Sequence, residues 1–242
     1  MEQVRARVDQ IVRDRQTADA LKPWYNQFCK RPCFHDDYLD TFNRPNVTLV
    51  DTQGRGVERI TEHGIVANGR EHVIDCLIYA TGFEVGTGYT RRSGYELYGR
   101  DGISLSEKWA DGVATLHGFH ARGFPNCFIV SNAQSGFTAN FPHMLNEQSK
   151  HIAYIVKHCA DRQVRTVETS QGAEDDWVKT VQSLAILRQK FFEECTPGYY
   201  NNEGKLSPLA ARNGPYGGGP IAFVKVLEDW RAKGDLEGLE LN

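Results

Sequence analysis

Strand-like and helix-like patterns of apolar residues alternate along this chain, and that alternation constrains its fold more than any other feature. Short strand signals fall at residues 47–51, 57–60, 64–68, 73–83, 127–131, 163–168 and 236–241. Helical spacing of apolar residues marks residues 2–22, 143–160, 171–195 and 221–233. Strands interleaved with long helices predict an α/β fold.

Local signals refine this outline. Asn68-Gly69 predicts a tight turn between two strands, and Ser104 or Ser106 is placed to cap a short helix. The helix predicted for residues 2–22 carries an apolar stripe that needs a partner surface, which we expect to belong to a part of the protein that this chain lacks.

The chain lacks a Gly-x-Gly-x-x-Gly turn after any of these strands. In dinucleotide-binding folds, that turn and the helix N-terminus behind it hold the cofactor pyrophosphate. The chain therefore carries no dinucleotide-binding fingerprint of its own.

Composition excludes several classes of protein. The chain has 242 residues, with 28 Lys and Arg against 31 Asp and Glu, so its formal net charge is −3. That balance is not typical of proteins that bind nucleic acid or an anionic membrane surface. The N-terminus is charged throughout, and no apolar run approaches the roughly 20 residues that a membrane span requires. We expect a soluble, cytoplasmic protein with no nucleic-acid or membrane partner.

The cysteines and histidines give weak signals. The six cysteines are scattered without a Cys-x-x-Cys pair, which favours reduced thiols in an intracellular compartment. Cys29, Cys33 and His35 lie close in sequence, but the second ligand pair of a zinc module is missing, so we expect no metal site. His117 and His120 are interpreted as structural or exposed.

Residues 75–83 form the sharpest local motif, an apolar strand signal that runs into Ala80, Thr81 and Gly82. Three small residues let the backbone turn tightly and approach a flat ligand closely. A buried strand that ends at a turn explains the same residues, and without further context it is the simpler interpretation.

An ordered set of segments carries a more specific signal. In chain order they are residues 29–32 (CKRP), 38–47, 75–83, 123–128 (GFPNCF) and 195–204. Together they resemble the C-terminal half of Baeyer–Villiger monooxygenases, FAD- and NADPH-dependent enzymes that insert one oxygen atom of O2 next to a ketone carbonyl. The resemblance implies the C-terminal portion of a flavoprotein with two dinucleotide-binding domains, whose Rossmann fingerprint segments are absent here.

The resemblance also implies a domain layout. Residues 1–22 match the end of a helical insertion, and residues 23–78 match the C-terminal part of the NADPH-binding domain. Residues 79–242 match the C-terminal part of the FAD-binding domain, with a mobile control loop near 195–205.

Arg31 matches the active-site arginine of this family, which holds the flavin peroxide anion and the bound nicotinamide. A guanidinium suits that role because it stays charged at any working pH and donates several hydrogen bonds in a plane. Lys30 matches a lysine near the 2′-phosphate of NADPH. Without the resemblance, Lys30 and Arg31 are more simply explained as a solvated basic pair.

Eight further residues are implied to lie near the cofactors. They are Ala80, Thr81 and Gly82 where the cofactor domains meet, Ser135, Gly136 and Met144 near the isoalloxazine ring, and Tyr199 and Tyr200 in the control loop. A Gly/Ser loop before a helix, with Met144 as its first core contact, is the ordinary alternative for the second group. A plain surface turn is the alternative for the two tyrosines.

Three functional interpretations follow from the sequence. The chain is the C-terminal part of a monooxygenase that uses FAD, NADPH, O2 and a small-molecule ketone, and it is inactive without the N-terminal half of the same enzyme. Alternatively, it is a short, non-catalytic binding or assembly module derived from a flavoprotein. The third interpretation makes the parent an N- or S-oxygenating flavin monooxygenase, but the context of Lys30 and Arg31 favours Baeyer–Villiger chemistry.

Overall fold

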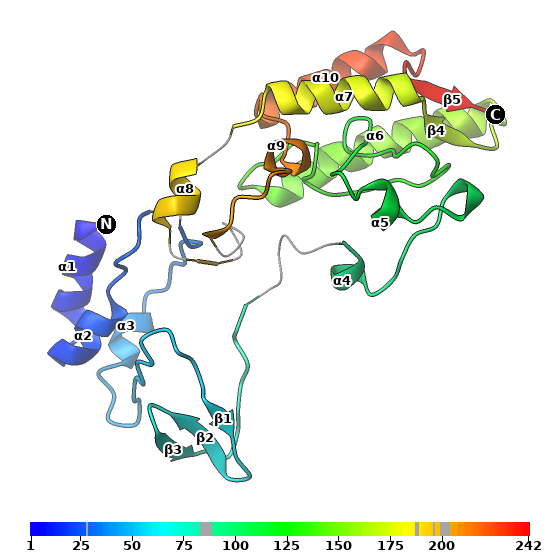
Figure 1. Ribbon diagram of the computed structural model, residues 1–242. Helices are drawn as coiled ribbons and strands as arrows, with labels where there is room; N and C mark the ends of the chain where they lie inside the picture. Colours follow the sequence, from blue (N-terminus) through cyan, green and yellow to red (C-terminus); the bar gives the residue numbers. More distant parts are fainter. Residues whose placement is uncertain (28, 83–88, 187–188, 196, 199–203) are drawn as a thin grey trace. The chain divides into compact units, whose positions relative to one another are not determined.

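The computed structural model describes residues 1–27, 29–82, 89–186, 189–195, 197–198 and 204–242. The chain divides into two compact units (Figure 1). The first unit comprises Met1–Gly86 and Lys190–Lys205, and the second comprises Thr87–Gln189 and Leu206–Asn242. Both units contain helices and short strands, so the predicted mixture of the two is confirmed. No helix among the described residues is long and apolar enough to cross a membrane.

The N-terminal residues of the first unit form two helices instead of the single helix predicted for residues 2–22. Helix α1 spans Glu2–Ile11 and helix α2 spans Arg15–Leu21. The break occurs because Asp14 adopts an extended conformation, and its side chain accepts a hydrogen bond from the Thr17 N–H at 2.8 Å.

The apolar stripe of these helices is largely covered within the chain, which corrects the expectation of an absent partner surface. Val8, Val12 and Ala18 are buried in a small core. Leu21 of α2 packs there, together with Leu39 of helix α3 (Tyr38–Thr41) and Phe42 beside it.

An antiparallel sheet follows in the first unit, with strands in the order β1 (Arg59–Ile60), β2 (Gly64–Ala67) and β3 (Arg70–Val73). The predicted turn at Asn68-Gly69 joins β2 to β3, and both residues have positive φ, at 52° and 71°. Asparagine and glycine tolerate this left-handed backbone better than other residues, which explains the turn.

The strand predicted for residues 73–83 is wrong for its described part, because residues 74–82 form no strand. Ile78 is 83% exposed and Tyr79 is 69% exposed. A strand needs a hydrogen-bonded neighbouring strand. The Ile74 N–H still donates to the His63 carbonyl oxygen at 3.2 Å, but no strand among the described residues pairs with the rest of this segment. Residues 47–51 and 127–131 likewise form no strand.

The second unit contains most of the helices and a two-stranded antiparallel sheet. Its helices are α4 (Tyr89–Ser93), η1 (Arg100–Gly102), α5 (Leu105–Lys108), α6 (Phe141–Asp161), α7 (Gln171–Ser183), α9 (Ala210–Asn213) and α10 (Pro220–Lys233). Strand β4 (Val167–Thr169) pairs with β5 (Leu239–Leu241). The helix predicted for residues 171–195 stops at Ser183, and a separate helix α8 covers Gln189–Glu194.

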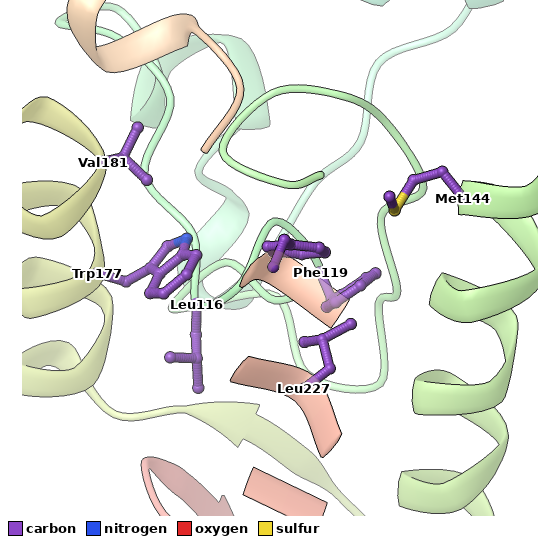
Figure 2. Close-up of a cluster of buried hydrophobic side chains, with 7 residues drawn as sticks. Leu116, Phe119, Met144, Trp177, Val181 and Leu227 are labelled. Atoms are coloured by element: carbon purple, nitrogen blue, oxygen red, sulfur yellow. The ribbon is translucent and has the colours of Figure 1, made fainter. Parts of the chain in front are cut away.

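Side chains from α6, α7 and α10 meet in the main core of the second unit (Figure 2). The buried members of this cluster are Leu116, Phe119, Met144, Trp177, Val181, Phe223 and Leu227. The indole N–H of Trp177 donates to the Gln134 carbonyl oxygen at 2.9 Å, so the one polar atom of this ring is satisfied inside the core. The loop that contains residues 134–136 is thereby fixed against α7.

Cys29 and Cys195 form a disulfide in the first unit, with their Cα atoms 5.2 Å apart. The prediction of six reduced thiols is therefore wrong for this pair, whereas Cys33, Cys76, Cys127 and Cys159 are free. The two bonded cysteines lie 166 residues apart, so local spacing gave no sign of their pairing. The prediction of a reducing compartment loses the support that it drew from six free thiols.

Candidate functional site

The arginine segment, defined as residues 29–33, combines a buried anchor with exposed charges. Cys29 is only 5% exposed, and its disulfide to Cys195 fixes it at the end of α8. Lys30 and Arg31 follow at once, and both are exposed. The Lys30 ammonium lies 5.8 Å from the centroid of the Tyr25 ring, within range of a cation–π contact.

Backbone contacts shape this segment further. The Cys29 N–H donates to the Asn26 carbonyl oxygen at 3.1 Å, closing a turn directly before the two cations. The Cys33 thiol lies 3.8 Å from the Arg31 carbonyl oxygen. The chain therefore presents two adjacent cations on a short loop whose base is covalently tied, an arrangement suited to an anionic ligand.

Ala80, Thr81 and Gly82 lie in the same unit and are all exposed. Gly82 has φ of 94°, in the left-handed region that side-chain-bearing residues avoid. Gly82 thus has the backbone conformation that glycine adopts most readily, whereas a tight turn here stays a prediction. A contact between these residues and a cofactor stays a prediction.

Ser135 and Gly136 of the second unit are buried. The Ser135 hydroxyl donates to the Ser131 carbonyl oxygen and accepts from the Gln148 side-chain amide at 3.0 Å. A Cβ atom at Gly136 would lie 2.6 Å from Phe223 and 2.7 Å from the Met144 sulfur, so only glycine fits there. These contacts position the loop before α6.

Met144 is fully buried in the core, as the alternative interpretation of this residue predicted. The helix that contains it, α6, begins after Asn140, whose side chain accepts from the His143 N–H at 3.3 Å. Cofactor contacts by Ser135, Gly136 and Met144 stay predictions. Tyr199 and Tyr200 lie outside the described residues.

Three buried histidines of the second unit are neutral. Burial lowers the pKa of His117 to about 3 and that of His120 to about 4. Burial, with smaller contributions from His117, Arg231 and His120, lowers the pKa of His151 to about 2. Both His117 and His120 are buried, so the exposed alternative is wrong and the structural interpretation stays a prediction. Among the described residues, no group of three or more His, Cys, Asp or Glu side chains is placed to hold a metal ion.

Two buried carboxylates that the sequence did not single out hold the turn at residues 123–126. Glu168 accepts from the Gly123 N–H at 3.1 Å and from Arg100 at 2.8 Å. Burial alone raises the pKa of Glu168, but these hydrogen bonds outweigh it, and the net pKa is lowered. Glu174 accepts from the Arg122 N–H at 2.7 Å and pairs with Lys108 at 2.9 Å. Their role is to position this turn.

Comparison with known proteins places the whole chain in one group, although no family model matches it. It is 58% identical to the neopentalenolactone D synthase of Streptomyces avermitilis, with 100% of the chain and 41% of that protein aligned. It is 47% identical to a Baeyer–Villiger monooxygenase of Stachybotrys chlorohalonatus, again over 100% of the chain and over 39% of that protein.

Solved structures that match the whole chain include proteins of the same kind. A polycyclic ketone monooxygenase from Thermothelomyces thermophila matches with a TM-score of 0.88 and 40% identity, covering 100% of the chain and 39% of that protein. A complex described as OTEMO with FAD and NADP matches with a TM-score of 0.75 and 28% identity, over 100% of the chain and 43% of that protein.

The fold and these matches define a part of a flavoprotein monooxygenase. More specifically, the chain matches part of proteins named as Baeyer–Villiger or ketone monooxygenases over its whole length, which is the resemblance that the ordered motifs predicted. It spans about two-fifths of the length of the curated relatives it matches, at 41% of one and 39% of another.

Proposed function

We propose that this chain is the C-terminal part of an FAD- and NADPH-dependent monooxygenase that converts a small-molecule ketone to an ester or lactone with O2. The observation that carries the proposal is the arginine segment, where Arg31 is exposed two residues after a buried, covalently fixed anchor. Relatives described as binding FAD, or FAD with NADP, support the choice of cofactors. Residues 23–78 are assigned to the NADPH-binding domain and residues 79–242 to the FAD-binding domain.

The two exposed cations fit anionic cofactors. FAD, when bound, supplies the activation of O2. The Arg31 guanidinium donates hydrogen bonds to negative charge that develops beside it, and it keeps its own proton while doing so. Lys30 supplies a point charge for the 2′-phosphate of NADPH. The backbone at Ala80, Thr81 and Gly82 gives a side-chain-poor surface for a flat ring.

The isolated chain is expected to be inactive. It has no glycine-rich turn for either pyrophosphate. Its exposed apolar residues at 77–79 suit burial against the N-terminal half of the same enzyme, which we propose as its partner.

The direct test compares wild type, Arg31→Ala and Arg31→Lys in the complete enzyme. Arg31→Ala is expected to lower ester yield at least 100-fold while slow NADPH oxidation continues. Arg31→Lys keeps the charge but loses the planar guanidinium, so its ester yield should lie between those of wild type and Arg31→Ala. Product is measured by gas chromatography and NADPH by absorbance. An unchanged ester yield in Arg31→Ala removes Arg31 from the site.

The same assay separates the alternative reactions. Amines and sulfides offered beside ketones distinguish N- or S-oxygenation from Baeyer–Villiger chemistry. An antibody against residues 221–242 tests the alternative that the chain is a short, non-catalytic module. A single band at 27.3 kDa on a denaturing gel of source-cell extract would favour that alternative. A band about twice as large is expected for a protein with two dinucleotide-binding domains.

A further inference from the structure

The Cys29–Cys195 disulfide joins two segments that matter to the proposed reaction. Cys29 is the first residue of the arginine segment, two positions before Arg31. Cys195 directly follows α8 and begins the stretch 195–205 that the sequence matched to a control loop. Both cysteines are buried, with 5% and 7% exposure, so the bond is shielded from solvent.

A second contact reinforces the connection. The Asn26 side-chain amide lies 3.5 Å from a carboxylate oxygen of Glu194, the last residue of α8. The Cys195 N–H donates to the Phe191 carbonyl oxygen at 3.2 Å, which continues the helical turn onto the bonded cysteine. The end of α8 is thus held to Cys29 covalently and to Asn26 by a polar contact.

The disulfide gives the arginine segment a covalently fixed starting point. Residues 29–37 form neither helix nor strand, so no repeating backbone hydrogen bonds fix them. One residue separates Cys29 from Arg31, and two peptide steps reach at most about 7 Å. With Cys29 bonded, the Arg31 backbone is confined to that radius from a fixed point.

We propose that the Cys29–Cys195 disulfide is a positioning element for Arg31, a role that rests on the proposed monooxygenase function. In the oxidised chain it holds the arginine segment on the end of α8. A dithiol such as dithiothreitol transfers two electrons and two protons, breaking the S–S bond to give two thiols while the dithiol closes to its own disulfide. Reduction releases the arginine segment, and Arg31 then stabilises the reacting oxygen less well.

The decisive measurement is coupling, defined as the ester formed per NADPH oxidised. Loss of a purely structural crosslink would lower stability but would leave coupling unchanged. The complete enzyme is compared as wild type, as the Cys29→Ser/Cys195→Ser double variant, and as Cys76→Ser. Cys76 is a matched control because it is an exposed free thiol in the same unit. Coupling is expected to fall at least threefold in the double variant, with NADPH oxidation retained, and to stay at the wild-type level in the control.

Reversible reduction of the wild type provides a second measurement if the double variant folds poorly. Dithiothreitol is applied until alkylation shows that the buried bond has opened, and it should then lower wild-type coupling to the level of the double variant. Removal of dithiothreitol and reoxidation by oxidised glutathione, which takes up the two electrons and two protons, should restore coupling, and the double variant should not respond. Alkylation of the denatured, unreduced chain should label the four free cysteines and leave Cys29 and Cys195 unlabelled.

The outcomes are separable. A wild-type enzyme that forms no ester overturns the proposed function and the positioning role with it. A productive wild type whose coupling survives both reduction and the double substitution overturns the positioning role alone, as does labelling of all six cysteines.

Discussion

The two units bury their apolar residues to different extents. The second unit encloses Phe119, Met144, Val181 and Phe223 at 0% exposure in one aromatic core. The core of the first unit is a small cluster centred on Val8, Val12 and Ala18. In that unit Val73, Ile78 and Tyr79 are 77%, 83% and 69% exposed.

This difference separates two kinds of candidate site residue. In the second unit, Ser135, Gly136 and Met144 are held by packing and hydrogen bonds that the chain supplies itself. In the first unit, Arg31 and residues 80–82 are exposed, and the apolar residues 78 and 79 that precede the latter are exposed as well. The candidate residues of the second unit are therefore positioned by contacts within the chain, whereas those of the first lie on a surface that a further part of the enzyme is expected to cover.

Acid should lower the stability of the second unit more than that of the first, because His117, His120 and His151 are buried there. Their folded pKa values of about 3, 4 and 2 lie below the ordinary 6.5, so the unfolded chain binds more protons below pH 6.5. Stability is therefore full above that pH and falls towards pH 4, by up to about 1.4 kcal/mol per pH unit for each histidine. Urea unfolding at pH 5 to 8, followed by tryptophan fluorescence, measures this slope.

Two variants test the origin of that slope. His120→Gln should reduce it by about the share of one histidine. His63→Gln, at an exposed position of the first unit, should leave it unchanged. An identical slope in wild type and His120→Gln would contradict the assignment.

Removal of a core side chain is expected to cause the next largest loss of stability. Phe223→Ala should destabilise the second unit by about 3–5 kcal/mol, because it leaves a cavity beside Trp177 and Met144. Ile221→Ala is the matched control in the same helix, since Ile221 is 86% exposed, and it should cost less than about 0.5 kcal/mol. Similar losses in the two variants would show that this core is not the main source of stability.

A smaller effect is expected at the start of α5. Ser104 and Glu107 form a capping box, in which the Ser104 hydroxyl accepts from the Glu107 N–H at 3.1 Å. Ser104→Ala should cost about 1 kcal/mol, as for other helix N-caps. Ser106 lies two residues further on, at an exposed position, so Ser106→Ala should be nearly neutral in the same urea titration. The reverse order would place the cap at Ser106, the other candidate in the sequence.

Local signals predicted local structure well. Asn68-Gly69 specified its turn, Ser104 specified its cap, and apolar spacing located α6 and α10 within a few residues. These features depend on residues close in sequence, where backbone preference and side-chain hydrogen bonds act directly.

Features that depend on distant partners were missed. The strand predicted at 73–83 needs a neighbour that the described chain does not supply, and the Cys29–Cys195 bond joins residues 166 positions apart. The arginine segment was found through its resemblance to a family, because two adjacent cations on an exposed loop have no distinctive pattern of their own. Glu168 and Glu174 gave no signal, since the backbone groups they accept from lie about 50 residues earlier.

Ile78→Ser tests the contrast between the units where the stability effect is smallest. In the chain alone, Ile78 is mostly exposed, so its unfolding free energy should change by less than about 0.5 kcal/mol. Val66→Ala, at a 2% exposed position of the same unit, should cost about 1–2 kcal/mol and serves as the comparison. In the complete enzyme Ile78→Ser should become as costly as Val66→Ala, because the proposed N-terminal half buries that side chain. Equal, small losses in both settings would mean that residues 74–82 stay uncovered in the complete enzyme, and would contradict the proposed contact with its N-terminal half.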